Sequence, residues 1–320
     1  MVATIYEVAD LAGVSPATVS RVMNGKNVSP AYAEKVRAAA SVLDFRPNRT
    51  ARTLRRRSSE VIALLIPDIE NPFFTALARG VEDQALAAGF SLVLCNTDEQ
   101  PAKEARYLDV ALSENVAGVI LAPATAATDL DALIARKTPL VTVDRSSRYD
   151  VDTVLMDNER GARTATQALY DRGFRRVGCI TGPQAVRTAQ QRAAGWRDVF
   201  AAHNPHAHPD NYVRYSNYRV DGGREAIADL LRMRHAPDAV FVANNLMSVG
   251  ALQQLFEVSK PPPAIGLASL GELPFTTWEP EGTSVIPWPA RQLGERAAQL
   301  LLARIGGETG PARTVILDSR

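Results

Sequence analysis

The stretch GVSPATVSRVMNG, residues 13–25, combines the signals for a glycine turn and for a very short helix that follows it. Gly13 can adopt the left-handed backbone that ends a helix, Ser15 is a good N-cap, and Pro16 suits the first helical position. The helix is predicted to end near Asn24. Its outer side carries hydroxyls and one arginine instead of the mixed charges of a solvated helix, which indicates a polar partner.

Two further helices are expected around this one. Apolar residues recur at helical spacing over residues 5–12, where Thr4 can cap the start, and again over residues 30–43. Two short helices around a tight turn, closed by a third, form a helix-turn-helix, whose second helix enters the DNA major groove. Arg21 can form two hydrogen bonds with guanine, and Ala17 can contact a thymine methyl. A purely structural three-helix cap is the alternative.

The next segment, RPNRTARTLRRRSSE at residues 46–60, holds six arginines and one acid. Repulsion among the arginines disfavours a helix unless phosphates neutralise them, so we expect this segment to order on DNA. Leu54 is its one large apolar side chain and a candidate wedge between base steps of the minor groove; a contact with the third helix is the alternative. Residues 1–60 hold 10 Lys/Arg and 5 Asp/Glu, although the whole chain has a formal net charge of +1.

These segments, together with IALLIPDIENPFF at residues 62–74, resemble the lactose/galactose repressor (LacI/GalR) family of bacterial transcription regulators. The resemblance covers essentially the whole chain. It implies a three-helix DNA-binding head, a hinge helix with a minor-groove leucine, a core like the sugar-binding proteins, and a homodimer on a palindromic operator. The residues predicted to contact the double-stranded DNA operator are Thr4, Ser15, Pro16, Ala17, Thr18, Ser20, Arg21, Asn24, Asn27, Ser29, Asn48, Ala51, Arg52, Leu54 and Arg55.

After Glu60 the pattern changes to apolar strand-like runs that alternate with helical stretches. This alternation predicts parallel sheets with helices on both faces, and its two series predict two doubly wound lobes. The predicted fold class is α/β, with an N-terminal helix-turn-helix head and two periplasmic-binding-protein-like lobes. The predicted strands are residues 61–67, 90–96, 117–123, 139–144, 176–182, 211–217, 239–245 and 263–269.

The predicted domains follow from these patterns and from the resemblance. The helix-turn-helix head takes residues 1–47, the hinge helix 48–58, and the effector-binding and dimerisation domain 59–320. Within that last domain, the predicted lobes are residues 59–158 with 287–313, and residues 159–286 with 314–320.

A ligand of such sheets binds beyond the carboxyl ends of the strands. The residues there supply aromatic, carboxylate, amide and guanidinium groups, which suit a sugar or another polyol. The predicted effector-binding residues, which the resemblance supports, are Phe73, Asp144, Arg192, Tyr218, Asn244 and Asn245. The sequence departs from the family at Asn245, where an aspartate is usual, and at Gly271 and Glu272, which replace two aspartates. A familiar effector is therefore not implied.

Other classes of protein are disfavoured. The sequence has no GxGxxG, Walker A, GxSxG or HExxH motif, so neither an enzyme nor a cofactor is predicted. The cluster HNPHAHPD, which contains His203, His206 and His208, is interpreted as a solvated loop, with a metal site as the alternative. Cys95 and Cys179 follow apolar runs and are predicted to be buried free thiols.

A solute-binding protein with an incidental N-terminus is the rival binding class. The N-terminal sequence lacks the charged region and the apolar region of a signal peptide. The arginine-rich segment is also not expected in a solute-binding protein. No apolar stretch reaches the roughly 18 residues of a membrane span. We therefore expect a cytoplasmic regulator without membrane association.

Overall fold

The structure is a computed structural model that describes residues 3–23, 27–45, 59–273 and 281–318. The chain divides into two compact units, Met1–Ser59 and Glu60–Arg320, and each is described by itself. Some of the predicted DNA contacts lie outside the described residues: Asn24, Asn48, Ala51, Arg52, Leu54 and Arg55.

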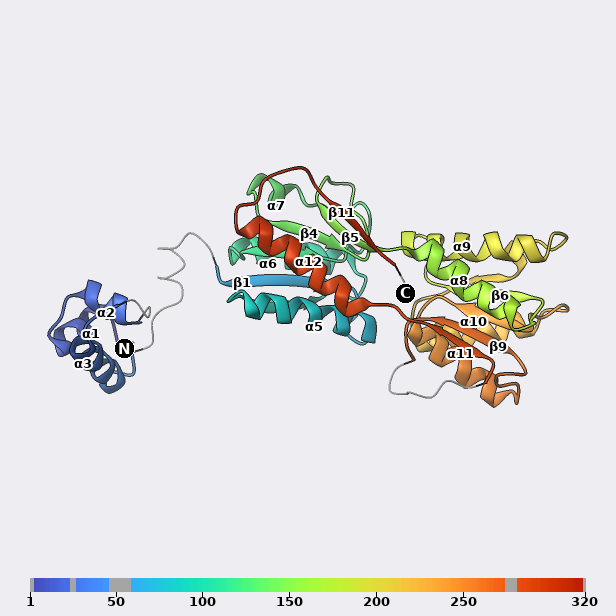
Figure 1. The fold of residues 1–320 in the computed structure, drawn as a ribbon, viewed down its shortest axis with the longest axis horizontal. Coiled ribbons are helices and arrows are strands. Elements are labelled where there is room, and N and C mark those ends of the chain that lie inside the picture. Colours follow the sequence, from blue (N-terminus) through green and yellow to red (C-terminus); the bar gives the residue numbers. More distant parts are fainter. Residues whose placement is uncertain (1–2, 24–26, 46–58, 274–280, 319–320) are drawn as a thin grey trace. The chain divides into compact units, whose positions relative to one another are not determined.

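The described part of the first unit contains the helices α1 (Ile5–Ala12), α2 (Pro16–Met23) and α3 (Pro30–Val42), as predicted (Figure 1). Gly13 has φ +64° and ends α1, so that α2 starts only four residues after α1 ends. The three helices are held together by a small apolar core, to which each contributes a fully buried valine: Val8, Val19 and Val36.

The second unit contains two sheets whose strands all pair in parallel. The first sheet has the order β11-β5-β4-β3-β1-β2. Its strands are β1 (Val61–Ile66), β2 (Ser91–Asn96), β3 (Gly118–Leu121), β4 (Leu140–Val143), β5 (Asp152–Met156) and β11 (Thr314–Leu317). Its helices are α5 (Pro72–Ala87), α6 (Pro101–Ser113), α7 (Asp131–Ala135) and α12 (Ala290–Ile305).

Both faces of this sheet are covered, which explains why β1 reads as a continuous apolar run. Ile62, Leu64 and Ile66 belong to the core that includes α5 and α12, which lie side by side in Figure 1. Ala63 and Leu65, which alternate with them, belong to the core that includes α6 and α7. Successive side chains of a strand point to opposite faces, so a strand buried on both faces needs apolar residues at every position.

The second sheet has the order β10-β9-β8-β6-β7. Its strands are β6 (Val177–Thr181), β7 (Val213–Tyr215), β8 (Ala239–Val242), β9 (Gly266–Leu270) and β10 (Thr283–Ile286). Its helices are α8 (Asn158–Asp171), α9 (Arg187–His203), the 3-10 helix η1 (Pro209–Asn211), α10 (Val220–Leu231) and α11 (Asn245–Glu257). The predicted fold class is confirmed.

Part of the predicted chain path is wrong. The sequence predicts residues 314–317 in the second lobe, but β11 pairs with β5 in the first sheet, from Thr314 opposite Thr153 to Leu317 opposite Met156. The reason is a buried ionic contact: Arg304 of α12 and Arg313 both bind Asp152 at the start of β5, and this holds the chain at that sheet edge. The strands β5, β10 and β11 were also absent from the prediction.

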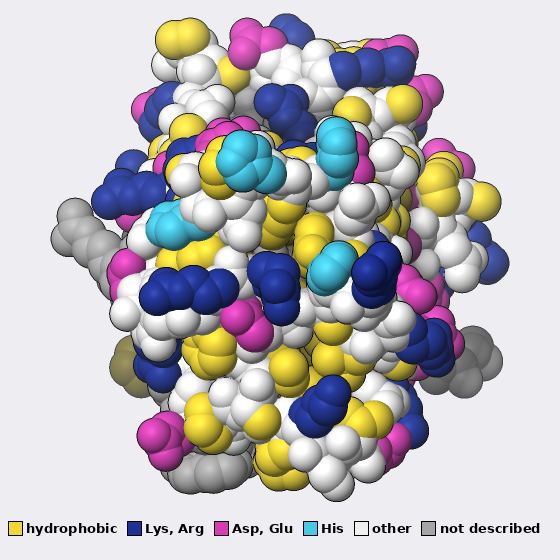
Figure 2. All heavy atoms as spheres, turned by 90° about the vertical axis from the view of Figure 1, so that its right-hand side faces the viewer, with side chains coloured by type: hydrophobic (Ala, Val, Ile, Leu, Met, Phe, Trp, Pro, Cys, Tyr) yellow, Lys and Arg dark blue, Asp and Glu magenta, His cyan; other side chains and the backbone are white. Residues whose placement is uncertain are grey.

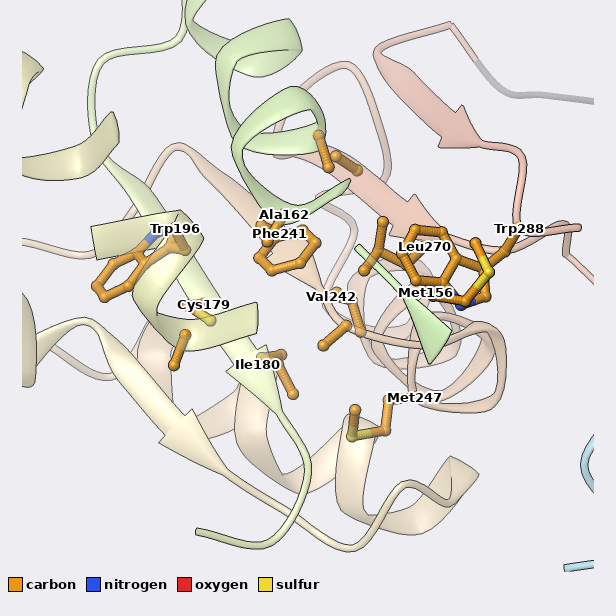
Figure 3. Packing of buried hydrophobic residues seen from close by; sticks show 14 of the residues in the cluster. Met156, Ala162, Cys179, Ile180, Trp196, Phe241, Val242, Met247, Leu270 and Trp288 are labelled. Atoms are coloured by element: carbon orange, nitrogen blue, oxygen red, sulfur yellow. The ribbon is translucent and has the colours of Figure 1, made fainter. Parts of the chain in front are cut away.

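The interior of the second lobe is dominated by large side chains. Figure 3 shows Trp196, Phe241, Leu270 and Trp288 within this packed cluster, and Cys179 lies among them. Both Cys179 and Cys95 are free and buried, as predicted.

No helix among the described residues is long and apolar enough to cross a membrane.

Candidate functional sites

The candidate DNA-binding face lies on α2 and begins at its N-cap. The Ser15 hydroxyl accepts a hydrogen bond from the Thr18 backbone N–H at 3.2 Å and contacts the Thr18 hydroxyl at 2.9 Å. Val19 is fully buried in the head, while Pro16, Ala17 and Arg21 are exposed. The core residue therefore fixes the rotation of the helix, and Pro16, Ala17 and Arg21, which are predicted to contact DNA, point outward.

The other described DNA-contact candidates differ in what their side chains do. Thr4 forms a capping box with Glu7: its hydroxyl accepts from the Glu7 N–H at 3.3 Å, and its own N–H donates to the Glu7 carboxylate at 2.6 Å. The hydrogen bonds that the Thr4 backbone N–H and hydroxyl donate to the Glu7 carboxylate lower the pKa of Glu7. Asn27 and Ser29 are exposed, whereas Thr18 and Ser20 are half-buried. Thr4 therefore caps the N-terminus of α1.

The second candidate site is a cavity of about 490 Å³ in the second unit. Its lining comes from the carboxyl-end loops of both sheets, as expected for doubly wound folds. All six predicted effector residues, which are separated by up to 172 positions, line it: Phe73, Asp144, Arg192, Tyr218, Asn244 and Asn245. The volume is within the range of small-molecule sites in proteins.

The Phe73 side of the cavity is set by the start of α5. The Asn71 side chain accepts a hydrogen bond from the Phe73 N–H at 3.0 Å, and Pro72 occupies the first turn. Both features are start signals of a helix. They place Phe73 on the first turn at the cavity, where its ring packs edge-on against Phe74 at a centroid distance of 4.9 Å.

Asp144 follows β4 with φ +64° and is only 4% exposed. Its Oδ2 lies 3.6 Å from Arg145 Nε, whereas its Oδ1 is buried and has no hydrogen-bond partner among the described residues. Burial raises the pKa of Asp144, although the charges of Arg145 and Arg192 oppose this shift. A buried carboxylate oxygen without a partner is costly, and it marks a place where a ligand can donate a hydrogen bond.

Arg145 also lines the cavity and links Asp144 to Glu99. Burial opposes its charge, but its two hydrogen bonds to Glu99, at 2.7 and 2.6 Å, and the nearby Asp144 raise the pKa of Arg145. A third hydrogen bond goes to the Pro123 carbonyl at 3.2 Å. Arg145 therefore stays protonated, and its charge opposes the rise in the pKa of Asp144.

Arg192 of α9 lies among aromatic rings on the opposite side. Its Nε donates to Asn158 Oδ1 and its Nη1 donates to the Ala243 carbonyl, both at 2.8 Å. Its guanidinium carbon lies 6.0 Å from the Tyr218 ring centre and 5.6 Å from that of Trp288. These contacts hold the guanidinium in one orientation at the cavity wall.

Tyr218 has φ +64°, a left-handed backbone that a bulky residue adopts only when its surroundings hold it. Its hydroxyl is 3.0 Å from the Thr188 hydroxyl, and its carbonyl accepts from Asn244 Nδ2 at 2.8 Å. Asn244 Oδ1 in turn accepts from the Met247 N–H and caps α11. Both ends of the Asn244 amide are thus used within the protein, which gives it a positioning role.

Trp288 is a cavity residue that the sequence prediction missed. It is 5% exposed, and its indole Nε1 has no hydrogen-bond partner in the described structure. The ring is seated on α8 at Gly161, where a Cβ would meet it at 2.5 Å. Trp288 follows β10, so recognition of that strand would have identified it by the same strand-end argument. Glu99 was also missed, because it lies three residues beyond the end of β2.

All three positions that depart from the family pattern line the cavity. Gly271 has φ +87°, and Glu272 is exposed. Asn245 is 7% exposed, and its Oδ1 accepts from the Leu246 N–H at 2.8 Å. None of the three supplies a second buried carboxylate beside Asp144.

The histidine cluster has other partners. Figure 2 shows the histidines spread over one face rather than converging on a point. His203 stacks on Tyr170 with ring centres 3.9 Å apart, and its Nδ1 contacts the Val199 carbonyl. No group of three or more metal-binding side chains occurs among the residues that the structure describes.

Comparison with known proteins bears on both sites. Residues 4–48 match the family described as "Bacterial regulatory proteins, lacI family", and residues 59–317 match "Periplasmic binding proteins and sugar binding domain of LacI family". The ribose operon repressor of Escherichia coli (strain K12) is 34% identical over 309 residues, which are 95% of this chain and 93% of that protein.

Two solved structures are similar over almost the full length. The transcriptional regulator CelR in complex with cellobiose is 29% identical, with a TM-score of 0.73 over 99% of this chain and 98% of the other. The lac repressor dimer bound to operator has a TM-score of 0.84 at 24% identity over 99% of this chain and 97% of the other, a likeness that concerns the fold.

Proposed function

Because the chain belongs to the LacI family of bacterial regulatory proteins, we propose that it is a sequence-specific repressor controlled by a small sugar or sugar-like effector. It binds a palindromic operator as a homodimer and acts in the cytoplasm, where its DNA is. The family membership confirms the prediction of a transcription regulator rather than an enzyme. The observation that carries the effector proposal is the cavity with its unpartnered buried Asp144 Oδ1.

DNA reading is proposed for the exposed face of α2. Arg21 supplies the bidentate donor for guanine, and Pro16 and Ala17 contact bases by shape. The hydroxyls of Ser15, Thr18 and Ser20 hydrogen-bond to phosphate oxygens and position the helix. The domain boundaries at residues 47 and 58, with a hinge between them that orders on DNA, remain part of this proposal.

The sugar-like effector is proposed from the chemistry of the cavity and from two relatives. One relative is named as a ribose operon repressor, and one similar structure is described as a complex with cellobiose. Aromatic side chains at Phe73, Tyr218 and Trp288 offer flat apolar surfaces, and Asp144 and Arg192 offer an acceptor and donors. That combination suits a ring with one apolar face and a rim of hydroxyls.

The homodimer is proposed from the edge of the first sheet. β2 is an edge strand, yet Val93 and Leu94 on it are 48% and 37% exposed, and Leu86 and Val110 on the neighbouring helices are 71% and 46% exposed. Exposed apolar edge strands are normally covered. A second copy of the chain is the occupant that a palindromic operator requires, since two symmetric heads must reach two half-sites.

Effector control is proposed to act through closure of the lobes around the cavity. Contacts between the two lobes include Arg219 with Asp68 at 3.9 Å and Arg187 with Ser146 at 3.3 Å. A ligand that binds both lobes shifts their relative arrangement, and this shift changes operator affinity by the coupling free energy between the sites.

The first test is selection of bound sequences from a random duplex pool with the full-length protein, followed by titration of the enriched sequence against salt. An enriched palindrome whose affinity falls steeply with salt is expected. The same titration with D-ribose or cellobiose then measures effector control. Absence of enrichment both with and without sugars would overturn the DNA-binding proposal.

A further inference from the structure

We infer that Glu99 is a positioning residue of the effector cavity: it holds both terminal nitrogens of Arg145 and leaves the third nitrogen, Nε, to bind a ligand. The inference rests on the proposed function, because it assigns a further residue to the same effector site. Glu99 lines the cavity, but it acts through Arg145 instead of contacting the ligand itself.

The contact between Glu99 and Arg145 consists of two parallel hydrogen bonds. Arg145 Nη1 donates to Glu99 Oε2 at 2.7 Å, and Arg145 Nη2 donates to Glu99 Oε1 at 2.6 Å. Such a paired contact fixes the orientation of the planar guanidinium as well as its distance. A further hydrogen bond from Nη1 to the Pro123 carbonyl, at 3.2 Å, adds a third restraint.

The remaining nitrogen of Arg145 is the one without a partner. Nε is buried and forms no hydrogen bond with any described residue, and it lies 3.6 Å from Asp144 Oδ2, which is too far for one. Asp144 Oδ1 also lacks a partner in the described part of the chain. Buried polar atoms that stay unpaired are costly. Two of them on adjacent cavity residues therefore mark one place for a ligand group.

The backbone that presents Glu99 is left-handed. Asp98 and Glu99 have φ +53° and +58°, and the cavity residues Asp144 and Tyr218 are left-handed as well. Strained residues of this kind gather at ligand clamps, where the surroundings hold them. The other described non-glycine residues with positive φ each follow the end of a helix, where this backbone is usual: Asp44, Asn115, Lys137 and Ser259.

The neighbours of Glu99 hold this turn in place. The Asp98 carboxylate accepts hydrogen bonds from Asn96 Nδ2 at 2.7 Å and from Lys103 Nζ at 2.5 Å. Asn96 Oδ1 in turn accepts from the Ile69 N–H at 3.0 Å. The turn after β2 is thereby tied to α6, which carries Lys103, and to the loop after β1. Glu99 is thus presented on a supported backbone.

The Pro123 carbonyl, which also binds Arg145, is held from the first turn of α6. There Glu104 is 1% exposed, and its carboxylate accepts from the Ala124 N–H at 2.7 Å and from the Thr128 hydroxyl at 2.6 Å. These hydrogen bonds fix the loop after β3, in which Pro123 directly precedes Ala124. Both groups that restrain Arg145 are therefore themselves held by neighbouring side chains.

Two other roles for Glu99 lead to different expectations. A Glu99 that contacted the ligand directly would affect ligand affinity whether or not Arg145 were present, although both of its carboxylate oxygens already accept from Arg145. A Glu99 that only neutralised the buried guanidinium would affect the stability of the protein and would not depend on Nε. A positioning role alone requires that Glu99 affect ligand affinity through Nε.

The test is a double-mutant cycle on the full-length protein with Glu99→Gln, Arg145→Lys and both together. Glu99→Gln replaces one acceptor by a donor and breaks the paired contact, whereas Arg145→Lys keeps the positive charge but has no Nε. Calorimetry measures the affinity for whichever of D-ribose, D-glucose and cellobiose binds the unmodified protein. We expect each single variant to bind it at least about tenfold more weakly, and the double variant to match Arg145→Lys within about twofold.

The Nε–H signal of Arg145 provides a readout that a purely structural role would not move. In NMR spectra of the arginine side chains, it is the signal that Arg145→Lys removes. We expect the sugar to shift this signal in the unmodified protein but not in Glu99→Gln.

Glu257→Gln is the matched control. It makes the same change of charge in an exposed pair with Arg224, and Glu257 is absent from the cavity lining. Sugar affinity should equal that of the unmodified protein. Thermal unfolding checks that every variant is folded.

The outcomes separate this inference from the proposed function. An undiminished sugar affinity in Glu99→Gln or in Arg145→Lys would overturn the positioning role while leaving effector control in place. A loss from Glu99→Gln that is equally large in the Arg145→Lys protein would also overturn it, because Glu99 would then act without Nε. If none of the three sugars binds, the proposed effector control itself fails, and this inference fails with it.

Discussion

Gly182, at the end of β6, lies so close to Tyr218 that a Cβ on the glycine would be 2.0 Å from Cζ of the tyrosine ring. Tyr218 forms one wall of the cavity and has a left-handed backbone held by Asn244. The glycine therefore provides the space in which the ring lies, and it helps to shape the cavity although it offers no side chain.

Gly182→Ala is expected to displace the Tyr218 ring and to weaken effector binding. Overpacking of a filled site costs about 1–3 kcal/mol, which corresponds to a loss of affinity of about 5- to 150-fold. Calorimetric titration of the binding sugar measures the change. Gly306→Ala is the control, since its Cβ would come no closer than 3.3 Å to any atom. An equal loss of sugar affinity in the two variants would contradict a role of Gly182 in shaping the cavity.

The affinity for the effector is expected to fall in acid. Burial raises the pKa of Asp144, and the ionised carboxylate accepts a hydrogen bond from a ligand hydroxyl more strongly than the protonated carboxyl group does. As pH falls, Asp144 takes up a proton before an ordinary aspartate with a pKa of about 3.9 does, and the hydrogen bond to the ligand is then weaker. Titrations over a pH series measure this. Asp144→Asn should remove the dependence, and a dependence that persists in the variant would assign it to another group.

Arg21→Ala is expected to weaken binding to the selected operator by about 1–3 kcal/mol, because a bidentate contact with guanine is lost. Binding to random DNA should change much less. Fluorescence anisotropy with both duplexes measures the two losses. Arg37→Ala removes an exposed arginine from α3 of the same unit and serves as the control for lost charge. An equal loss on operator and random DNA would exclude Arg21 from base reading.

Asp152 is expected to stabilise the fold at neutral pH but not in acid. It is 2% exposed and is bound by Arg304 Nε at 2.8 Å and by Arg313 Nη2 at 3.1 Å. These contacts lower its pKa to about 2, against the opposing effect of burial. Because the folded pKa is the lower one, the stabilisation is complete above about pH 4 and is lost as pH falls towards about 2.

Asp152→Asn should therefore lower the free energy of unfolding by at least about 2 kcal/mol at neutral pH. It should also flatten the acid side of the stability profile, as measured by denaturant unfolding over a pH series. Asp198→Asn disrupts an exposed pair with Arg163 and should cost less than about 1 kcal/mol. Similar losses in both variants would contradict a special role for the buried carboxylate.

Val93→Glu is expected to dissociate the proposed homodimer, because it places a charge in the apolar surface of the β2 edge. Sedimentation velocity measures the dimer, and operator affinity should fall at least about tenfold as the second head is lost. Ile316→Glu is the matched control. Ile316 is 60% exposed on β11, the opposite edge of the same sheet. If Ile316→Glu dissociates the dimer and Val93→Glu does not, the interface lies at the β11 edge instead of the β2 edge.

Much of the candidate site could be anticipated from local sequence. A parallel sheet brings the carboxyl ends of its strands to one edge, so residues after recognised strands were expected near each other, and Asp144, Tyr218 and Asn244 do line one cavity. Trp288 escaped this reasoning because β10, with the sequence TSVI, is short and half polar. When a strand is not recognised in the sequence, the residues that follow it are not predicted to lie at the edge of the sheet.

The sequence by itself determined the helix-turn-helix, since Gly13, Ser15 and Pro16 act through backbone preferences that need no distant partner. It also determined the alternation of strand and helix, because burial on both faces demands continuous apolar runs. Tertiary structure alone decided which sheet receives β11, because strand pairing depends on a partner such as Asp152 that is far away in the chain. It also decided that the Asn244 amide is occupied while Asp144 Oδ1 lacks a partner in the described structure, since hydrogen-bond satisfaction depends on the folded surroundings.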